Sequence, residues 1–143
     1  MGAARISYSA LEMEIMKFYP KNPPRGFEVG FDKKVIIRDC GVLELAADEQ
    51  VTLSTEQGGE YDVTRKSWGF YATPSMNGRL SSFGLRAVLV KNRLNRHFVL
   101  LVENGHQHAF QKYCEQEPLT VVAWLDDPRD LERIGRAISP EHG

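Results

Sequence analysis

The sequence has few of the features that mark secreted, membrane-spanning or disulfide-stabilised proteins. Its 143 residues include only two cysteines, too few for a disulfide framework. No stretch approaches the roughly 18 apolar residues needed to cross a membrane, and the opening MGAARISYSA is too polar for a signal peptide. We therefore expect a soluble, cytoplasmic protein without a membrane partner.

The sequence also lacks the short motifs of common enzyme classes. No glycine-rich nucleotide-binding loop, GxSxG or HExxH pattern occurs. The stretch His106-Gln107-His108 resembles the metal motif of cupins, in which two histidines lie on one strand; here it opens a predicted helix, where side chains two residues apart diverge. We predict neither a metal nor a cofactor. Whether the protein is an enzyme stays open, with His97 and Tyr71 as the available proton-transfer groups.

The arrangement of apolar residues predicts a single α+β domain over residues 1–143, built on a mainly antiparallel sheet of about six to eight strands. Residues 85–125 have the pattern β-β-α-β: GLRAVLV and HFVLLVE form a hairpin, GHQHAFQKYCEQE a helix, and LTVVAWL a short central strand. Residues 127–139 predict a terminal helix, because Asp127 can cap it and Pro128 suits its first position.

The N-terminal half has a less regular pattern. Within residues 1–26, the segment 9–19 fits either a helix or a strand, because it has both capping-box spacing and alternating acidic residues. The three prolines of YPKNPPRG predict a loop over residues 19–26. Residues 27–84 are predicted to be a β-hairpin region, with a turn at Asp39–Gly41.

Acidic residues are missing from a long internal segment. Residues 63–102 contain none but carry seven cations, whereas the remaining 11 cations and 19 acids leave −8 on the rest of the chain. A basic surface on an acidic body attracts anions, and arginine suits bidentate contact with phosphate or carboxylate. The alternative is that acids from neighbouring strands pair with these cations. Solvation alone accounts for the three in the hairpin tip KNRLNR. The seven are Arg65, Lys66, Arg79, Arg86, Lys91, Arg93 and Arg96.

The segment KSWGFYATPSMNGRL, residues 66–80, lies inside this window and mixes aromatic, hydroxyl and amide side chains. If DVTRKSWGFYAT is one strand, Trp68 and Phe70 share a face, and Gly69 leaves a shallow platform beside Tyr71 on the other. The polar residues after Tyr71 exceed what a turn requires, which is typical of binding loops. A purely structural loop has the same composition and remains the alternative.

These patterns favour three functions, in order. The first is binding of an anionic small molecule: a phosphorylated or carboxylated sugar, or a nucleotide. The alternative is a non-catalytic interaction subunit or homodimer whose basic face docks an acidic partner. Binding of single-stranded nucleic acid comes third, because a pI near 6.4 disfavours it. In the first function aromatic rings stack on the ligand, hydroxyl and amide groups hydrogen-bond to it, and arginines neutralise it. The predicted ligand-binding residues are Arg65, Trp68, Tyr71, Ser75, Asn77, Arg79 and Arg86.

Overall fold

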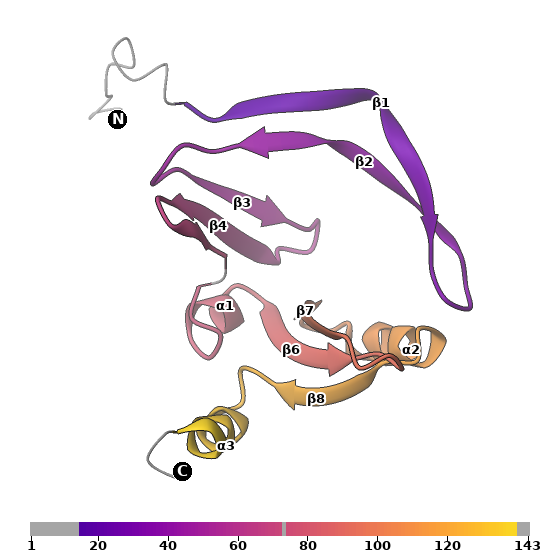
Figure 1. Cartoon of the computed structure of the whole chain (residues 1–143), viewed down its shortest axis with the longest axis vertical. Coiled ribbons are helices and arrows are strands. Elements are labelled where there is room, and N and C mark those ends of the chain that lie inside the picture. Colours follow the sequence, from indigo (N-terminus) through magenta and orange to yellow (C-terminus); the bar gives the residue numbers. More distant parts are fainter. Residues whose placement is uncertain (1–14, 73, 140–143) are drawn as a thin grey trace.

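Three antiparallel sheets and three helices make up the part of the chain that the computed structural model describes, residues 15–72 and 74–139 (Figure 1). The α+β class and the antiparallel pairing are confirmed, but the strands form three small sheets rather than one main sheet. The first sheet pairs β1 (Lys17–Val29) with β2 (Val35–Glu44), and the second has the order β3 (Gln50–Ser54), β4 (Glu60–Lys66), β5 (Gly69–Tyr71). The third places β6 (Leu85–Lys91) between β7 (His97–Glu103) and β8 (Thr120–Trp124). The helices are α1 (Arg79–Ser82), α2 (Gln107–Gln116) and α3 (Pro128–Ile138).

The third sheet and α2 enclose one of the two buried clusters. The side chains of Val88 and Val90 on β6 are fully buried, because Phe110, Leu119 and Trp124 pack against them. The backbone of β6 pairs with β7 on one edge and β8 on the other. The central strand is therefore β6, not the LTVVAWL strand expected from the sequence. Helix α2 lies beside this sheet (Figure 1). Its Phe110 packs against the buried cluster and meets the Trp124 ring edge-on at 5.9 Å. The predicted β-β-α-β order is confirmed.

Helix α3 begins where local chemistry predicts. The Asp127 side chain accepts a hydrogen bond from the Arg129 backbone N–H at 2.8 Å, and Pro128 occupies the first turn. That hydrogen bond holds the pKa of Asp127 below its ordinary value. The predicted terminal helix is confirmed, and no helix within the described ranges has the length and apolarity needed to cross a membrane.

The first sheet is a long, bent arm whose tip reaches toward α2 (Figure 1), and it corrects two expectations. Residues 19–26 are not a loop but part of β1, at the point where its register with β2 shifts. Such a bulge tolerates prolines because its residues need not donate to the ladder. The turn expected at Asp39–Gly41 is not formed, because β2 runs without interruption through these residues. A Cβ on Gly41 would lie only 2.6 Å from the Tyr19 carbonyl oxygen, so the close strand pairing requires this glycine.

The ambiguous segment 9–19 is described only in part. Residues 9–14, which carry the capping-box pair, lie outside the described residues. From Lys17 onward the chain is strand, so the end of the segment, residues 17–19, is not helical.

Leu80 joins the second and third sheets. It lies on the short helix α1, is fully buried, and forms a cluster with Leu85 and Ala87 of β6. Tyr61 of β4 packs against the same cluster. A polar contact supports the junction, because the Glu103 carboxylate of β7 accepts hydrogen bonds from the loop between β3 and β4. The second and third sheets are thus held together by both apolar and polar contacts.

Candidate functional site

The segment 66–80 folds differently from the expected strand and loop. A two-residue turn separates β4 from β5, so Lys66 pairs with Gly69 across a tight hairpin. Trp68 lies in this turn and is 70% exposed. The single strand that put Trp68 and Phe70 on one face is therefore wrong, because the turn reverses the chain between them.

A pocket of about 320 Å³ does form beside β5, and we call it the Arg79 pocket. It brings together three of the seven predicted ligand-binding residues: Tyr71, Ser75 and Arg79. The second sheet supplies one wall and the loop before α1 the other. Its lining residues are Gln50, Asp62, Thr64, Tyr71, Pro74, Ser75 and Arg79.

The polar groups of the Arg79 pocket bond mainly to one another. The Arg79 guanidinium donates to the Asp62 carboxylate at 3.3 Å and lies 5.0 Å from the centre of the Phe83 ring. The Ser75 hydroxyl accepts a hydrogen bond from the Arg79 backbone N–H at 2.8 Å. Because Asp62 offsets the charge of Arg79, the pocket has little net attraction for an anion.

Arg86 lies elsewhere and has a structural partner. Its guanidinium donates to both carboxylate oxygens of Asp126, at 2.7 and 3.1 Å, and lies 4.1 Å from the centre of the Trp124 ring. The hydrogen bond that Arg86 donates to Asp126 raises the pKa of Arg86 above its ordinary value. This bidentate geometry leaves Arg86 poorly placed to bind a ligand.

The other predicted residues are also dispersed. Arg65 donates to the carbonyl oxygens of Leu45 and Lys66, which places it in the frame of the second sheet. Trp68 and Asn77 are exposed and line neither the Arg79 pocket nor the larger cavity described below. The two proton-transfer candidates are separated as well, because Tyr71 lines the Arg79 pocket whereas His97 begins β7.

Ion pairs thus engage much of the acid-free window. Lys66 pairs with Asp48 at 2.5 Å, in addition to the pairs that Arg79 and Arg86 make. Arg65 donates to backbone carbonyl oxygens instead of forming an ion pair. The other three cations lie at the β6–β7 hairpin tip, where no ion pair to a described residue is formed. They are Lys91, Arg93 and Arg96. Free positive charge is therefore concentrated at this tip rather than in segment 66–80.

A cavity larger than the Arg79 pocket lies beside that hairpin, with a volume of about 560 Å³. We call it the α2 cavity, because it lies between the third sheet and the C-terminal end of α2. Fully buried Val90 forms part of its wall, and the other strand residues are apolar. Its lining residues are Phe31, Val90, Asn92, Arg93, Leu94, Phe98, Leu100, Tyr113, Glu117, Pro118 and Leu119.

The tip of the β1–β2 arm supplies one wall of the α2 cavity. The backbone N–H of Phe31 donates to the two carboxylate oxygens of Glu117, at 3.0 and 3.1 Å. The Arg93 guanidinium lies 4.9 Å from the centre of the Phe31 ring, within the range of a cation–π contact. The arm is therefore docked at its tip by one charged hydrogen bond and one ring contact.

Arg93 is the polar group of the α2 cavity with the most unused hydrogen-bonding capacity. The Asn92 side-chain oxygen already accepts hydrogen bonds from the backbone N–H groups of Leu94 and Arg96, which shapes the hairpin tip. Glu117 is engaged by Phe31. Arg93 contacts an aromatic face, and no hydrogen bond to its guanidinium is formed within the described ranges.

Sequence reasoning missed this cavity, although one signal was present. Leu94 is a large apolar residue among the polar residues of KNRLNR, and it lines the α2 cavity. The sequence interpretation explained the cations of this hairpin tip by solvation and did not consider Leu94 beside them. The contribution of Phe31 had no local signal, because it comes from a distant part of the chain.

No group of three or more histidine, cysteine or acidic side chains within the described ranges is arranged to hold a metal ion. Comparison with family models, curated protein sequences and solved structures finds no match to the chain. Its function is therefore inferred from the geometry of its cavities and surfaces.

Proposed function

We propose that the protein binds a small molecule with an apolar body and one anionic group, such as a carboxylate, in the α2 cavity. The observation that carries this proposal is the combination of an apolar wall with Arg93. Eight of the eleven lining residues are apolar or aromatic, and Arg93 makes no ion pair with a described residue. Such a site offers burial to a hydrocarbon and a charged partner to a head group.

The size and the lining of the α2 cavity narrow the class of ligand. A volume of about 560 Å³ is within the range of small-molecule sites. Apolar walls would leave the hydroxyl groups of a sugar or nucleotide without hydrogen-bonding partners, at a cost in binding energy. We therefore keep the anionic group of the ligand that the sequence suggested. In place of its sugar or nucleotide body, we propose an aliphatic or aromatic one.

The charges around the hairpin tip support an anionic head group. Lys91, Arg93 and Arg96 lie within a few residues of one another, and the acid at this rim, Glu117, is held by the Phe31 backbone. Clustered positive charge beside low-dielectric walls attracts an anion and strengthens its hydrogen bonds. The Arg79 pocket is the weaker candidate because Arg79 already forms an ion pair with Asp62.

Replacing Arg93 tests this proposal with a defined probe. We expect isothermal titration calorimetry to show that the wild-type protein binds decanoate, and that Arg93→Gln weakens this binding by about tenfold or more, the effect of one charge-assisted hydrogen bond. Arg96→Gln is the matched control, because Arg96 is on the same hairpin but does not line the α2 cavity. It should change the affinity by no more than about twofold.

Decanol separates the contribution of the head group from that of the apolar body. We expect decanol to bind the wild-type protein more weakly than decanoate, and Arg93→Gln to leave the binding of decanol unchanged. The proposal is contradicted if the wild-type protein binds neither compound. It is equally contradicted if the two arginine variants lose decanoate to the same extent, which would indicate unspecific attraction to the basic tip.

A further inference from the structure

The second sheet carries polar side chains along one of its faces. Cross-strand partners share a face, and Thr64 of β4 pairs with both Gln50 of β3 and Tyr71 of β5. Asp62 lies two residues before Thr64 on β4, so its side chain is on that face as well. These four residues form one side of the Arg79 pocket, and we call them the pocket floor. None of them lines the α2 cavity.

Hydrogen bonds between neighbouring strands hold the pocket floor in place. The Thr64 hydroxyl donates to the Gln50 side-chain oxygen at 2.8 Å, and the Thr52 hydroxyl donates to the Asp62 carboxylate at 2.7 Å. The Asp62 side chain is only 14% exposed. Because these groups lie on paired strands, they are positioned before a ligand arrives, which lowers the entropy cost of binding.

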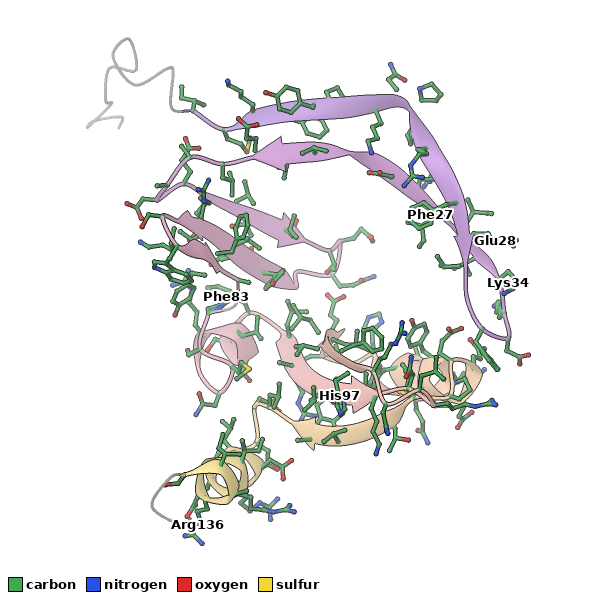
Figure 2. All side chains as sticks on the ribbon, viewed as in Figure 1. Phe27, Glu28, Lys34, Phe83, His97 and Arg136 are labelled. Atoms are coloured by element: carbon green, nitrogen blue, oxygen red, sulfur yellow. The ribbon has the colours of Figure 1, made fainter. Side chains whose placement is uncertain are left out.

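The loop before α1 forms the other side of the pocket and is tied to the start of that helix. Pro74 is buried. The Ser75 carbonyl oxygen accepts a hydrogen bond from the Leu80 N–H at 3.0 Å, and the Ser75 hydroxyl accepts one from the Arg79 N–H at 2.8 Å. The Arg79 guanidinium lies over the ring of Phe83, which Figure 2 shows at the junction of α1 with the second sheet. Both sides of the pocket are thus fixed by the fold.

The polar groups of the pocket bond to one another but retain unused capacity of both kinds. Within the described ranges, the Arg79 guanidinium donates one side-chain hydrogen bond, to Asp62, although it has several N–H groups. The Asp62 carboxylate accepts from Arg79 and Thr52 and has further lone pairs. The Tyr71 hydroxyl and the Gln50 amide NH₂ have no hydrogen-bonding partner among the described residues. The pocket therefore offers donors and acceptors side by side.

The charges of the pocket cancel. Among its described lining residues only Arg79 and Asp62 are charged, and they form an ion pair at 3.3 Å. A hydroxyl group can donate to the carboxylate and accept from the guanidinium at the same time, so it can bind beside the ion pair without breaking it. An anion would be attracted by Arg79 but repelled by Asp62. This arrangement favours a neutral ligand that carries several hydroxyl groups.

We propose that the Arg79 pocket is a second binding site, which takes a neutral sugar of the size of a monosaccharide. Its volume of about 320 Å³ is at the lower end of the range for small-molecule sites. The apolar C–H face of a sugar ring packs on the ring of Tyr71, which is 52% exposed. The hydroxyl groups at the edge of the sugar hydrogen-bond to Asp62, Arg79 and Gln50. The site shares no lining residue with the α2 cavity and does not depend on its ligand.

Tyr71 and Trp68 provide a matched test. In NMR titrations of the isotope-labelled full-length chain, we expect at least one of D-glucose, D-mannose and D-galactose to bind with a dissociation constant of about 10 mM or lower. Tyr71→Ala should weaken this binding by about fivefold or more, because it removes the ring on which the sugar packs. Trp68→Ala should stay within about twofold, since Trp68 lies in the neighbouring turn and does not line the pocket. Both side chains are more than half exposed, so both variants should fold.

The 6-phosphate of the sugar that binds tests the charge of the pocket. The wild-type protein should bind it no more than about twofold tighter than the neutral sugar, because Asp62 offsets the charge of Arg79. Asp62→Asn keeps the size of the side chain but removes that offset. It should tighten the binding of the 6-phosphate by about fivefold or more, and about 0.5 M NaCl should abolish the gain.

The proposal is overturned if none of the three sugars binds, or if the Tyr71 and Trp68 variants weaken binding equally. A wild-type preference for the 6-phosphate greater than about twofold also overturns it, because the pocket would then be an anion site.

Discussion

The variant Leu80→Ala is expected to lose about 3 kcal/mol of the free energy of unfolding, measured by urea denaturation, and about 10 °C of thermal stability. Leu80 is fully buried against Leu85 and Ala87, and Tyr61 packs on the same cluster from another sheet. Truncation removes the transfer energy of three carbon atoms and leaves a cavity that strands on both sides cannot close. The effect is large because few side chains in the described ranges are fully buried.

Leu94→Ala is the matched control for this prediction. Leu94 is the same residue type but is 73% exposed at the tip of the β6–β7 hairpin. Its truncation should change the free energy of unfolding by less than about 0.5 kcal/mol. If the two leucine variants were destabilised equally, Leu80 would not be the residue that joins the second and third sheets.

The parts of the fold that follow from nearby residues were predictable. Asp127 caps α3 by accepting a hydrogen bond from a backbone N–H only two residues away. A short stretch of sequence is therefore enough to predict this cap. The β6–β7 hairpin likewise follows from two apolar runs joined by a polar turn. The arm was not predictable in this way. Whether prolines lie in a loop or in a bulge depends on the partner strand, which the residues 19–26 do not encode.

The structure disperses the predicted site residues for a related reason. The acid-free window is continuous in the sequence, but the acids that pair with it are not part of it: Asp62 lies 17 residues before Arg79, and Asp126 lies 40 residues after Arg86. Folding therefore neutralised the arginines that seemed free in the sequence. The α2 cavity needs a contact between Phe31 and Glu117, which are 86 residues apart. No pattern within a short segment predicts such a contact.

The second large effect is expected at Arg86, whose partner Asp126 holds it against Trp124. Asp126→Ala should lower the free energy of unfolding by about 2 kcal/mol, because it leaves a half-buried guanidinium without its carboxylate. The Asp126 side chain is only 9% exposed and that of Arg86 32%, so solvent replaces little of the lost interaction. Glu132→Ala is the control, since Glu132 pairs with Arg136 on the exposed surface of α3. It should cost less than about 0.5 kcal/mol.

A double-mutant cycle then decides what Arg86 does. If Arg86 and Asp126 act as one structural unit, the two alanine variants and the double variant in urea denaturation should give a coupling energy of about 1 to 2 kcal/mol. Decanoate affinity should stay within about twofold of wild type in Arg86→Ala as long as the protein is folded, because Arg86 does not line the α2 cavity. A coupling energy near zero, together with loss of decanoate binding, would return Arg86 to the set of ligand-binding residues that the sequence suggested. The structure favours the first result, because the guanidinium already has both carboxylate oxygens of Asp126 and the face of Trp124 as partners.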